Sequence, residues 1–233
     1  MTDSASLGEQ DVLLALDTSG RVGSVAVGKG PAVLAQVSLT EHREHAARLI
    51  PAIDAVLSEA STSLGDLAGI VVGEGPGSFT GVRVAAATAK GLAHALGIPL
   101  WAISSLTAAA LASEVGPVRY VLFDARGDRV YGACYGVGTV AVQELVAPHG
   151  GTLRDALAGD VPPGAVFTGE AAELHMAAIE AAGFPVEAAQ GELLAVGLLR
   201  YLTRHMDASP VLDPSSWEPA YIRASSAERL WSK

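Results

Sequence analysis

An order of elements that occurs twice constrains the fold of this chain more than any other feature. Three consecutive apolar runs have the length of β-strands, and a helical apolar stripe, a short strand and a second helix follow them. After Gly116-Pro117 the same order starts again. The repeat predicts an α/β protein of two duplicated βββαβα lobes, residues 1–116 and 117–233. The expected strands are 12–18, 22–27, 32–38, 69–73, 100–103, 118–123, 130–135, 140–146 and 165–168, and the expected helices are 41–60, 79–96, 105–113, 152–158 and two that begin at Glu170 and Glu192.

Proline and glycine refine this pattern at three places. Pro51 lies inside the expected helix 41–60, where its ring and its missing N–H predict a kink. The segments 148–151 and 162–164 are rich in Pro and Gly. Both are expected to be loops within the second lobe.

Composition narrows the classes of function. The chain has a formal net charge of -10, with 15 Lys and Arg against 25 Asp and Glu. Because proteins hold nucleic acid mainly through basic side chains, we do not expect this chain to bind it tightly alone. The single cysteine, Cys134, excludes a disulfide framework and is expected to be a buried thiol. No apolar run reaches the roughly 18 residues of a membrane helix, so a cytoplasmic protein without membrane contact is expected.

An aspartate ends the first expected strand of each lobe, in Asp17-Thr18-Ser19 and in Asp124-Ala125-Arg126. Two such hairpins resemble the actin-like ATPase (ASKHA) superfamily, in which they hold the phosphates of a nucleotide. The second hairpin here offers one glycine and two arginines, where close approach of backbone N–H groups to phosphate needs glycines. An aspartate that closes a tight turn explains both hairpins equally well.

The most specific local feature is the run 73–83, which reads Gly-Glu-Gly-Pro-Gly-Ser-Phe-Thr-Gly-Val-Arg. Its spacing fits neither a Walker loop nor a dinucleotide fingerprint. It predicts a strand-to-helix turn in which Ser78 caps the helix, with N–H groups free to receive an anion; capping without a ligand is the alternative. The candidate nucleotide or phosphate residues are Asp17, Thr18, Ser19, Gly75, Gly77, Ser78 and Thr80.

Together these motifs resemble the bacterial TsaB (YeaZ) family over nearly the whole chain. The resemblance also rests on the run 41–45 (Glu-His-Arg-Glu-His) and the run 98–106. It implies a subunit of the machinery that installs threonylcarbamoyl on the adenosine 3′ of the anticodon in tRNAs that read codons beginning with A. In that machinery a TsaD-like subunit performs the transfer, a TsaE-like subunit is an ATPase, and the TsaB-like subunit forms a heterodimer with the TsaD-like one.

The resemblance further implies a subunit with no catalytic residues and no metal site. TsaD-like relatives hold a metal through a His-x-x-x-His pair, and the matching positions here are Ser105 and Ala109, which lack imidazoles. Their adenosine loop is matched only by Thr168-Gly169-Glu170. We therefore expect no cofactor of its own, with ATP or ADP as a candidate at the partner interface. His42 and His45 stand three apart on a helix, but a helix face or interface is a better expectation than a two-ligand metal site.

The helices 41–60 and 79–96 carry small apolar residues on more than one face, which predicts a docking surface for the TsaD-like partner. A homodimer is expected when that partner is absent, and tRNA contact only through the complex. Periodicity alone fits equally well a second helix enclosed in the core. The rival functions are a self-sufficient ATP-binding phosphotransferase or hydrolase, and a sugar-kinase remnant that binds a small molecule. The candidate interface residues are His45, Arg48, Leu49, Ala52, Ile53, Val82, Arg83, Ala86, Ala89 and Lys90.

Overall fold

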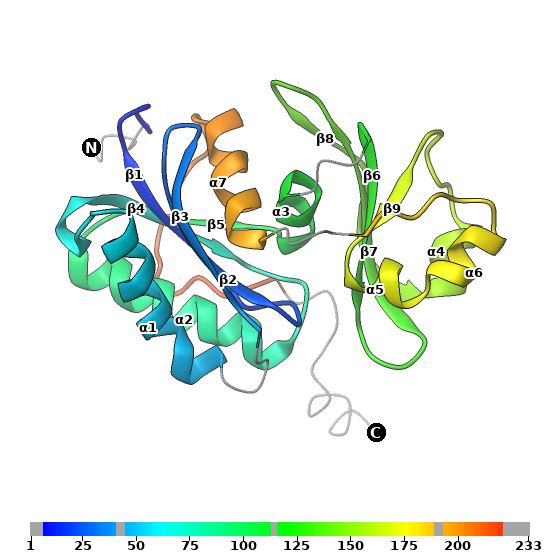
Figure 1. Ribbon diagram of the computed structural model, residues 1–233, viewed down its shortest axis with the longest axis horizontal. Coiled ribbons are helices and arrows are strands. Elements are labelled where there is room, and N and C mark those ends of the chain that lie inside the picture. Colours follow the sequence, from blue (N-terminus) through cyan, green and yellow to red (C-terminus); the bar gives the residue numbers. More distant parts are fainter. Residues whose placement is uncertain (1–6, 41–44, 113–115, 189–192, 221–233) are drawn as a thin grey trace.

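Two β-sheets, one from each half of the chain, form the framework of the protein (Figure 1). The computed structural model describes residues 7–40, 45–112, 116–188 and 193–220. Residues 41–44 and the expected ends of two helices at Ser113 and Glu192 lie outside these ranges. The repeated order βββαβα is confirmed, because three antiparallel strands, a helix, a strand and a helix occur in both halves.

The first sheet has five strands in the order β3-β2-β1-β4-β5. Its strands, and the helices of the first half, are β1 (Val12–Asp17), β2 (Gly23–Lys29), β3 (Ala32–Leu39), β4 (Leu67–Gly73), β5 (Leu100–Ile103), α1 (His45–Glu59), α2 (Phe79–Leu96) and α3 (Ser105–Ala112). β1 pairs antiparallel with β2 and parallel with β4. Leu14 and Leu16 of β1 pack with α1 and α2, whereas Leu13 and Ala15 face a second core. Both faces of the sheet are covered, which explains why these strands are apolar throughout.

The second sheet has four strands in the order β8-β7-β6-β9. Its strands, and the helices of the second half, are β6 (Val118–Asp124), β7 (Arg129–Val137), β8 (Val142–Thr152), β9 (Val166–Thr168), α4 (Leu153–Ala158), α5 (Glu170–Leu174), α6 (Met176–Ala181) and α7 (Leu194–Arg204). Tyr120 and Leu122 of β6 pack with α4, α5 and α6 on one face. Val121 and Phe123 pack with α3 on the other, so α3 lies between the sheets. The expected burial of Cys134 is confirmed, since its side chain is part of the first of these two cores.

The prediction that residues 148–151 form a loop is wrong, because they belong to β8. β8 is an edge strand, where the missing N–H of Pro148 does not disrupt an inner ladder. Gly132 pairs with His149 and Cys134 pairs with Val146, so Ala133 alone stands opposite two residues in a β-bulge. The bulge accommodates Pro148, so β8 continues past this residue.

α1 is continuous across Pro51, so the proline does not break the helix. Pro51 has no N–H for the carbonyl four residues before it, which is that of Ala47. Ala47 is exposed and lies near the start of α1, at His45. Water can hydrogen-bond this carbonyl, which lowers the cost of the proline.

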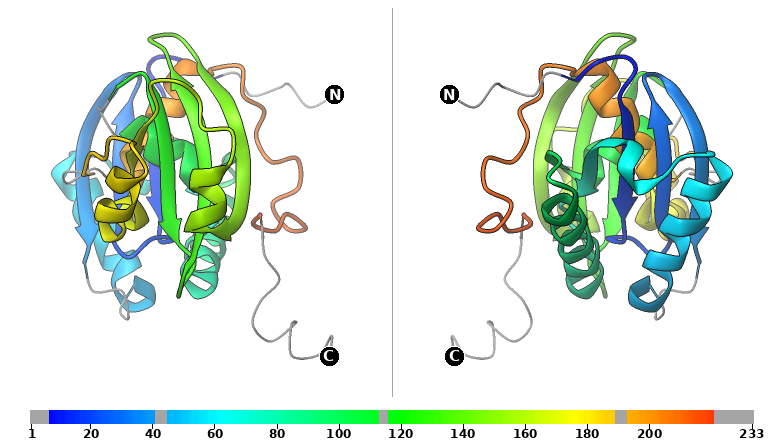
Figure 2. Two further views of the ribbon diagram at one scale, coloured as in Figure 1. Left: turned by 90° about the vertical axis from the view of Figure 1, so that its right-hand side faces the viewer. Right: turned by 90° about the vertical axis from the view of Figure 1, so that its left-hand side faces the viewer.

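The last described segment returns from the second half to the first sheet. Leu198 and Leu202 of α7 pack against the β1 face opposite to α1 and α2. Gly197 lets α7 approach α3 closely, because a Cβ there would collide with the carbonyl of Ala108. Beyond α7 the N–H of Val211 donates to the carbonyl of Leu100 at 2.8 Å, and the orange segment after α7 runs outside the first lobe in Figure 2. The expected boundary near Gly116 remains a prediction, but residues 193–220 include segments that pack with the first sheet.

Candidate functional site

The turn after β1 and the glycine-rich loop before α2 lie directly against each other. The N–H of Ser78 donates to the carbonyl of Ser19 at 2.7 Å, and the hydroxyl of Thr18 donates to the carbonyl of Gly81 at 2.6 Å. A Cβ at Gly77 would collide with the backbone of Ser19, and one at Gly81 with that of Thr18. Glycine is therefore needed at both positions because two backbones touch there. The loop and the turn form one unit.

The predicted helix cap is confirmed, because Ser78 Oγ accepts the N–H of Gly81 at 3.3 Å. Two N–H groups that the sequence left free for an anion, those of Ser78 and Gly81, thus have partners within the chain. Gly75 is a third case, since its N–H donates to Ser105 Oγ at 3.1 Å. Thr80 is exposed in the first turn of α2. The structure brings the other six candidate phosphate residues together, and their phosphate-binding role stays a prediction.

Asp17 is the buried centre of this unit. One carboxylate oxygen accepts the N–H and the hydroxyl of Ser19 at 2.7 and 2.6 Å, and the other accepts the hydroxyl of Ser105 at 2.6 Å. Burial raises the pKa of Asp17, and the hydrogen bonds from Ser105 and Ser19 partly offset that rise. Ser105 is also fully buried. The first position matched to a metal-binding histidine in TsaD-like relatives therefore serves an internal hydrogen-bond network here.

The other positions weighed for a metal site are Ala109, His42 and His45. Ala109 lies on α3 in the core between the sheets. Within residues 7–40, 45–112, 116–188 and 193–220, no three His, Cys, Asp or Glu side chains gather closely enough to hold an ion. His45 is buried, with Nε2 3.1 Å from the carbonyl oxygen of Leu39, while His42 lies outside the described residues.

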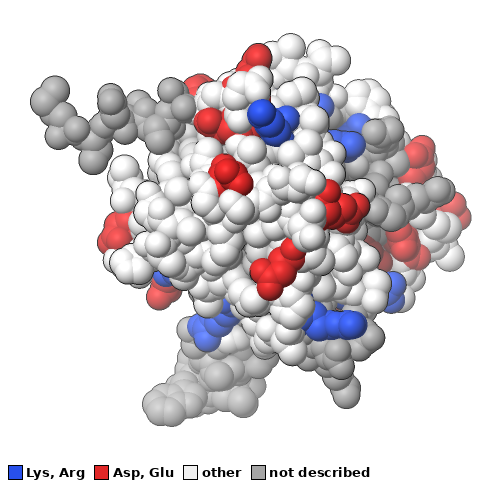
Figure 3. All heavy atoms as spheres, turned by 60° about the vertical axis from the view of Figure 1, so that its left-hand side comes forward, with Lys and Arg blue, Asp and Glu red and all other residues white. Residues whose placement is uncertain are grey.

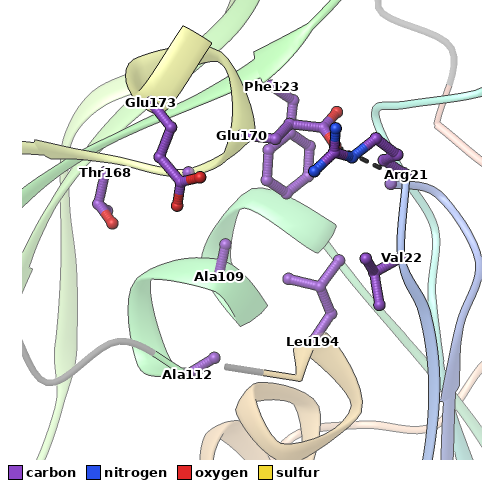
Figure 4. Close-up of a pocket in the computed structure, with 11 residues that line it drawn as sticks. Arg21, Val22, Ala109, Ala112, Phe123, Thr168, Glu170, Glu173 and Leu194 are labelled. Atoms are coloured by element: carbon purple, nitrogen blue, oxygen red, sulfur yellow. Dashed lines mark hydrogen bonds between the residues drawn. The ribbon is translucent and has the colours of Figure 1, made fainter. Parts of the chain in front are cut away.

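A cavity of about 170 Å³ lies between the two lobes (Figure 4). The turn after β1 contributes Gly20, Arg21 and Val22 to its wall, and the chain around α5 contributes Thr168 and Glu170, among others. Thr168-Gly169-Glu170 is the segment that the sequence matched to an adenosine loop. The cavity is smaller than the roughly 300–1,000 Å³ of pockets that hold drug-sized ligands.

The turn after β6 is mainly closed by local contacts. Asp124 Oδ1 accepts the N–H of Arg126 at 2.7 Å, as expected for an aspartate that closes a tight turn. Arg126 and Gly127 both have positive φ angles, 68° and 73°. The N–H of Asp124 points instead to the carboxylate of Glu170, at 3.4 Å. The sequence matches the segment that contains Glu170 to an adenosine loop, but it does not show which groups this carboxylate contacts.

The side chains predicted to form the partner interface differ in burial, and their interface role stays a prediction. Arg48 and Arg83 are exposed and Lys90 is half-buried. The other seven are buried within the chain, and four of them, Leu49, Ala52, Ile53 and Ala89, belong to the core on the first sheet. These buried residues are His45, Leu49, Ala52, Ile53, Val82, Ala86 and Ala89.

The outward face of the same two helices carries other apolar residues, which are not among the candidate interface residues. Ile50 of α1 is 49% exposed and Phe79 of α2 is 40% exposed. The guanidinium of Arg83 stacks over the Phe79 ring, 3.8 Å from its centroid. Ala47 and Ala87 are also exposed. α1 and α2 lie side by side on one face of the first sheet (Figures 1 and 2).

Comparison with known proteins gives consistent matches. Residues 32–227 match the family model TsaD, described as tRNA N6-adenosine threonylcarbamoyltransferase. The chain is 32% identical to the "tRNA threonylcarbamoyladenosine biosynthesis protein TsaB" of Bacillus subtilis, over 94% of this chain and 97% of that protein. It is 37% identical to the protein of the same name from Escherichia coli, over 53% of this chain and 54% of that protein.

Solved structures agree with these matches. "YeaZ from Pseudomonas aeruginosa" superposes with a TM-score of 0.74 and 27% identity, over 91% of this chain and 99% of that one. Component A of the (R)-2-hydroxyglutaryl-CoA dehydratase of Acidaminococcus fermentans superposes with a TM-score of 0.52 over 85% of this chain and 100% of that one. At 12% identity this second likeness concerns the fold alone.

Proposed function

The chain belongs to the TsaB (YeaZ) family, and from that premise we propose that it is the partner subunit of a TsaD-like transferase in tRNA threonylcarbamoyladenosine biosynthesis. It has the two-lobed α/β architecture of the actin-like superfamily, as the sequence predicted. The structural observation that carries the proposal is the outward face of α1 and α2, where apolar side chains remain exposed.

We propose that the subunit does no chemistry of its own. Ser105 and Ala109 replace the imidazole pair that the family resemblance implies for a TsaD-like metal site, and Ser105 is committed to the carboxylate of Asp17. The N–H groups of Gly75, Ser78 and Gly81 in the glycine-rich loop donate within the chain. The cavity between the lobes is also small for a nucleotide. These observations support a subunit without a cofactor of its own, and ATP or ADP would then bind at the interface with the partner.

The outward face of α1 and α2 suits a helical partner surface. A half-exposed Ile50 and Phe79 offer apolar area, and exposed Ala47 and Ala87 let another backbone come close. Arg83, stacked on Phe79, places a charge beside an aromatic ring, a combination often found at the centre of interfaces. The occupant that we propose is the TsaD-like subunit, and a second copy of this chain would cover the same face when that subunit is absent.

The proposal extends to the other components. Figure 3 shows a face on which acidic and basic side chains are interspersed, with no continuous basic area. Together with the net charge of -10, this supports contact with tRNA only through the complex. A TsaE-like ATPase completes the proposed assembly. The proposed location of the whole assembly is the cytoplasm. Among the described helices, none is both long and apolar enough to cross a membrane.

Substitution of Ile50 tests the docking face. An arginine at this half-exposed position can extend into water in the free subunit, so Ile50→Arg should fold, but it places a charge in the proposed interface. We expect the dissociation constant for the purified TsaD-like subunit, measured by titration calorimetry, to rise about tenfold or more. Val140→Arg is the matched control, because Val140 is 77% exposed in the second lobe and outside the proposed face.

Unchanged affinity of a folded Ile50→Arg variant would place the interface elsewhere. An equal loss of affinity in Val140→Arg would show that any added charge is enough, and it would contradict the assignment to α1 and α2. Tight binding and turnover of ATP by the isolated chain would favour the self-sufficient phosphotransferase or hydrolase.

A further inference from the structure

The chain after α7 forms a clip, residues 208–220, along the edge of the first sheet (Figure 2). The last strand of that sheet on this side is β5. The N–H of Val211 donates to the carbonyl of Leu100 in β5 at 2.8 Å, and the indole N–H of Trp101 in β5 donates to the carbonyl of Ala208 at 2.9 Å. The clip therefore covers part of an edge that would otherwise be open to another chain.

Trp217 anchors the clip to α2 and to the glycine-rich loop. Its ring packs against the core on the first sheet, and Lys90 of α2 lies over it, with Nζ 5.6 Å from the ring centroid. Lys90 Nζ also donates to the carbonyl of Ser215 at 3.4 Å. In the glycine-rich loop, the carboxylate of Glu74 accepts the indole N–H of Trp217, and the carbonyl of Glu74 accepts the N–H of Ala220 at 3.1 Å. The clip thus contacts both α2 and the loop that leads into it.

A hydrogen-bonded turn in the clip presents Trp217 to the first lobe. Asp213 Oδ1 accepts the N–H and the hydroxyl of Ser215 at 2.9 and 2.6 Å, and Oδ2 accepts the hydroxyl of Ser216 at 2.6 Å. The N–H of Trp217 donates to the carbonyl of Asp213 at 3.0 Å. The hydrogen bonds from the two serines lower the pKa of Asp213 to about 2, so this carboxylate remains a charged acceptor at neutral pH. Leu212, just before the turn, is 100% exposed.

The clip and α1 lie on opposite flanks of α2. In the order of the sheet, α1 packs on β2 and β3, α2 packs on β1, β4 and β5, and the clip follows at the β5 edge. Phe79 and Arg83 of the proposed docking face lie in the first turns of α2, directly after the glycine-rich loop. We propose that the clip holds α2 and this loop in the orientation that docking requires, with Trp217 as a positioning residue. The inference rests on the proposed function and concerns the same face.

Preorganisation explains why the clip affects affinity. Without the Trp217 anchor, α2 loses its contacts on the β5 flank, and a partner can bind only those molecules in which α2 is in place. The apparent dissociation constant then rises in inverse proportion to the fraction of such molecules. Trp217 itself is half-buried against the core on the first sheet, so the effect requires no contact between this side chain and the partner.

Removal of the anchor tests the inference. Trp217→Ala leaves every residue of α1 and α2 in place. In the free chain, the amides of residues 79–96 should exchange with deuterium at least about fivefold faster, as measured by mass spectrometry. The dissociation constant for the purified TsaD-like subunit should rise by about the same factor. Trp217→Phe keeps a ring against the core and Lys90, so it should recover most of the protection and most of the affinity.

Two control variants separate positioning from other effects. Leu212→Arg adds a charge to the fully exposed part of the clip and leaves the anchor intact. It should change neither the exchange of residues 79–96 nor the affinity. Ile179→Val weakens the core of the second lobe, where Ile179 is fully buried. It should lower the free energy of unfolding and leave the affinity for the partner unchanged.

Several outcomes would overturn the role of the clip. One is unchanged exchange and unchanged affinity in a folded Trp217→Ala while Ile50→Arg still weakens binding, a result that would leave the proposed function standing. Another is an equal loss of affinity in Leu212→Arg, which would make the clip a contact surface, or in Ile179→Val, which would assign the loss to general destabilisation. If the unmodified chain does not bind the TsaD-like subunit, the proposed function fails, and the exchange rates of residues 79–96 in the free chain decide on the clip.

Discussion

At the scale of single residues, the buried Asp17 links the β1 turn to Ser105, which in turn contacts the glycine-rich loop. Its carboxylate is fully buried and accepts hydrogen bonds from Ser19 and Ser105, which stand 2 and 88 positions further along the chain. Burial raises its pKa above the ordinary value of 3.8. The folded chain therefore holds this proton at pH values where the unfolded chain has released it.

Asp17→Asn should flatten the pH dependence of stability. Between pH 3.8 and the raised pKa, the folded state binds more protons, so the free energy of unfolding falls as pH rises, by at most about 1.4 kcal/mol per pH unit. Below pH 3.8 both states are protonated and the contribution is fully present. Asparagine has no such proton, and its amide oxygen can still accept the N–H of Ser19. Urea unfolding at a series of pH values measures the difference, and parallel profiles of the two proteins would contradict it.

Sequence could predict those residue roles that depend on near neighbours. The cap by Ser78 follows from the residues next to it, and it is confirmed. The burial of Cys134 follows from its apolar strand, and burial raises the pKa of this thiol to about 11. The contact of Ser105 with Asp17 and that of Glu170 with Arg21 join segments 88 and 149 positions apart. No local pattern contains these contacts, because they depend on how the two lobes meet.

At the scale of elements, the helical stripe on α1 and α2 marks mainly the face that is buried within the chain. The 3.6-residue period predicts which side chains face a common direction, and here that direction is the first sheet. Leu49 is fully buried, whereas its neighbour Ile50 is 49% exposed. The helices themselves were predicted well, with α2 at Phe79–Leu96 as expected. A side chain available to a partner is recognised only once the core face is known.

Two glycines of α2 should respond in opposite ways to alanine. A Cβ at Gly81 would collide with the Thr18 carbonyl in the backbone of the β1 turn, so Gly81→Ala should lose about 1–3 kcal/mol of unfolding free energy. Gly91 is exposed in the same helix and has nothing within 4 Å of an added Cβ, so Gly91→Ala should gain about 0.5–1 kcal/mol. Denaturant unfolding of both variants gives the comparison. Equal effects would show that helix propensity alone, and not contact with the β1 turn, governs Gly81.

At the scale of the whole molecule, the repeat predicts the two sheets but not the path that ties them together. α7 leaves the second half and packs on the first sheet, and α3 lies between the two cores. The apolar pattern of α7 predicts a helix with one buried face, yet it does not say which sheet that face will meet. Glu170 adds a polar connection between the same lobes. Contacts between the two repeated halves therefore hold the molecule together.

The most direct test of the account is threonylcarbamoylation of tRNA in a reconstituted mixture of the TsaD-like and TsaE-like subunits, supplied with ATP and with threonylcarbamoyl-adenylate as the donor, measured with and without this chain. The account predicts no product and no ATP turnover from the chain alone, product when all subunits are present, and a loss with Ile50→Arg that follows its loss of partner affinity. Product or turnover from the isolated chain, or full activity with a folded Ile50→Arg that no longer binds its partner, would contradict the role of a docking subunit.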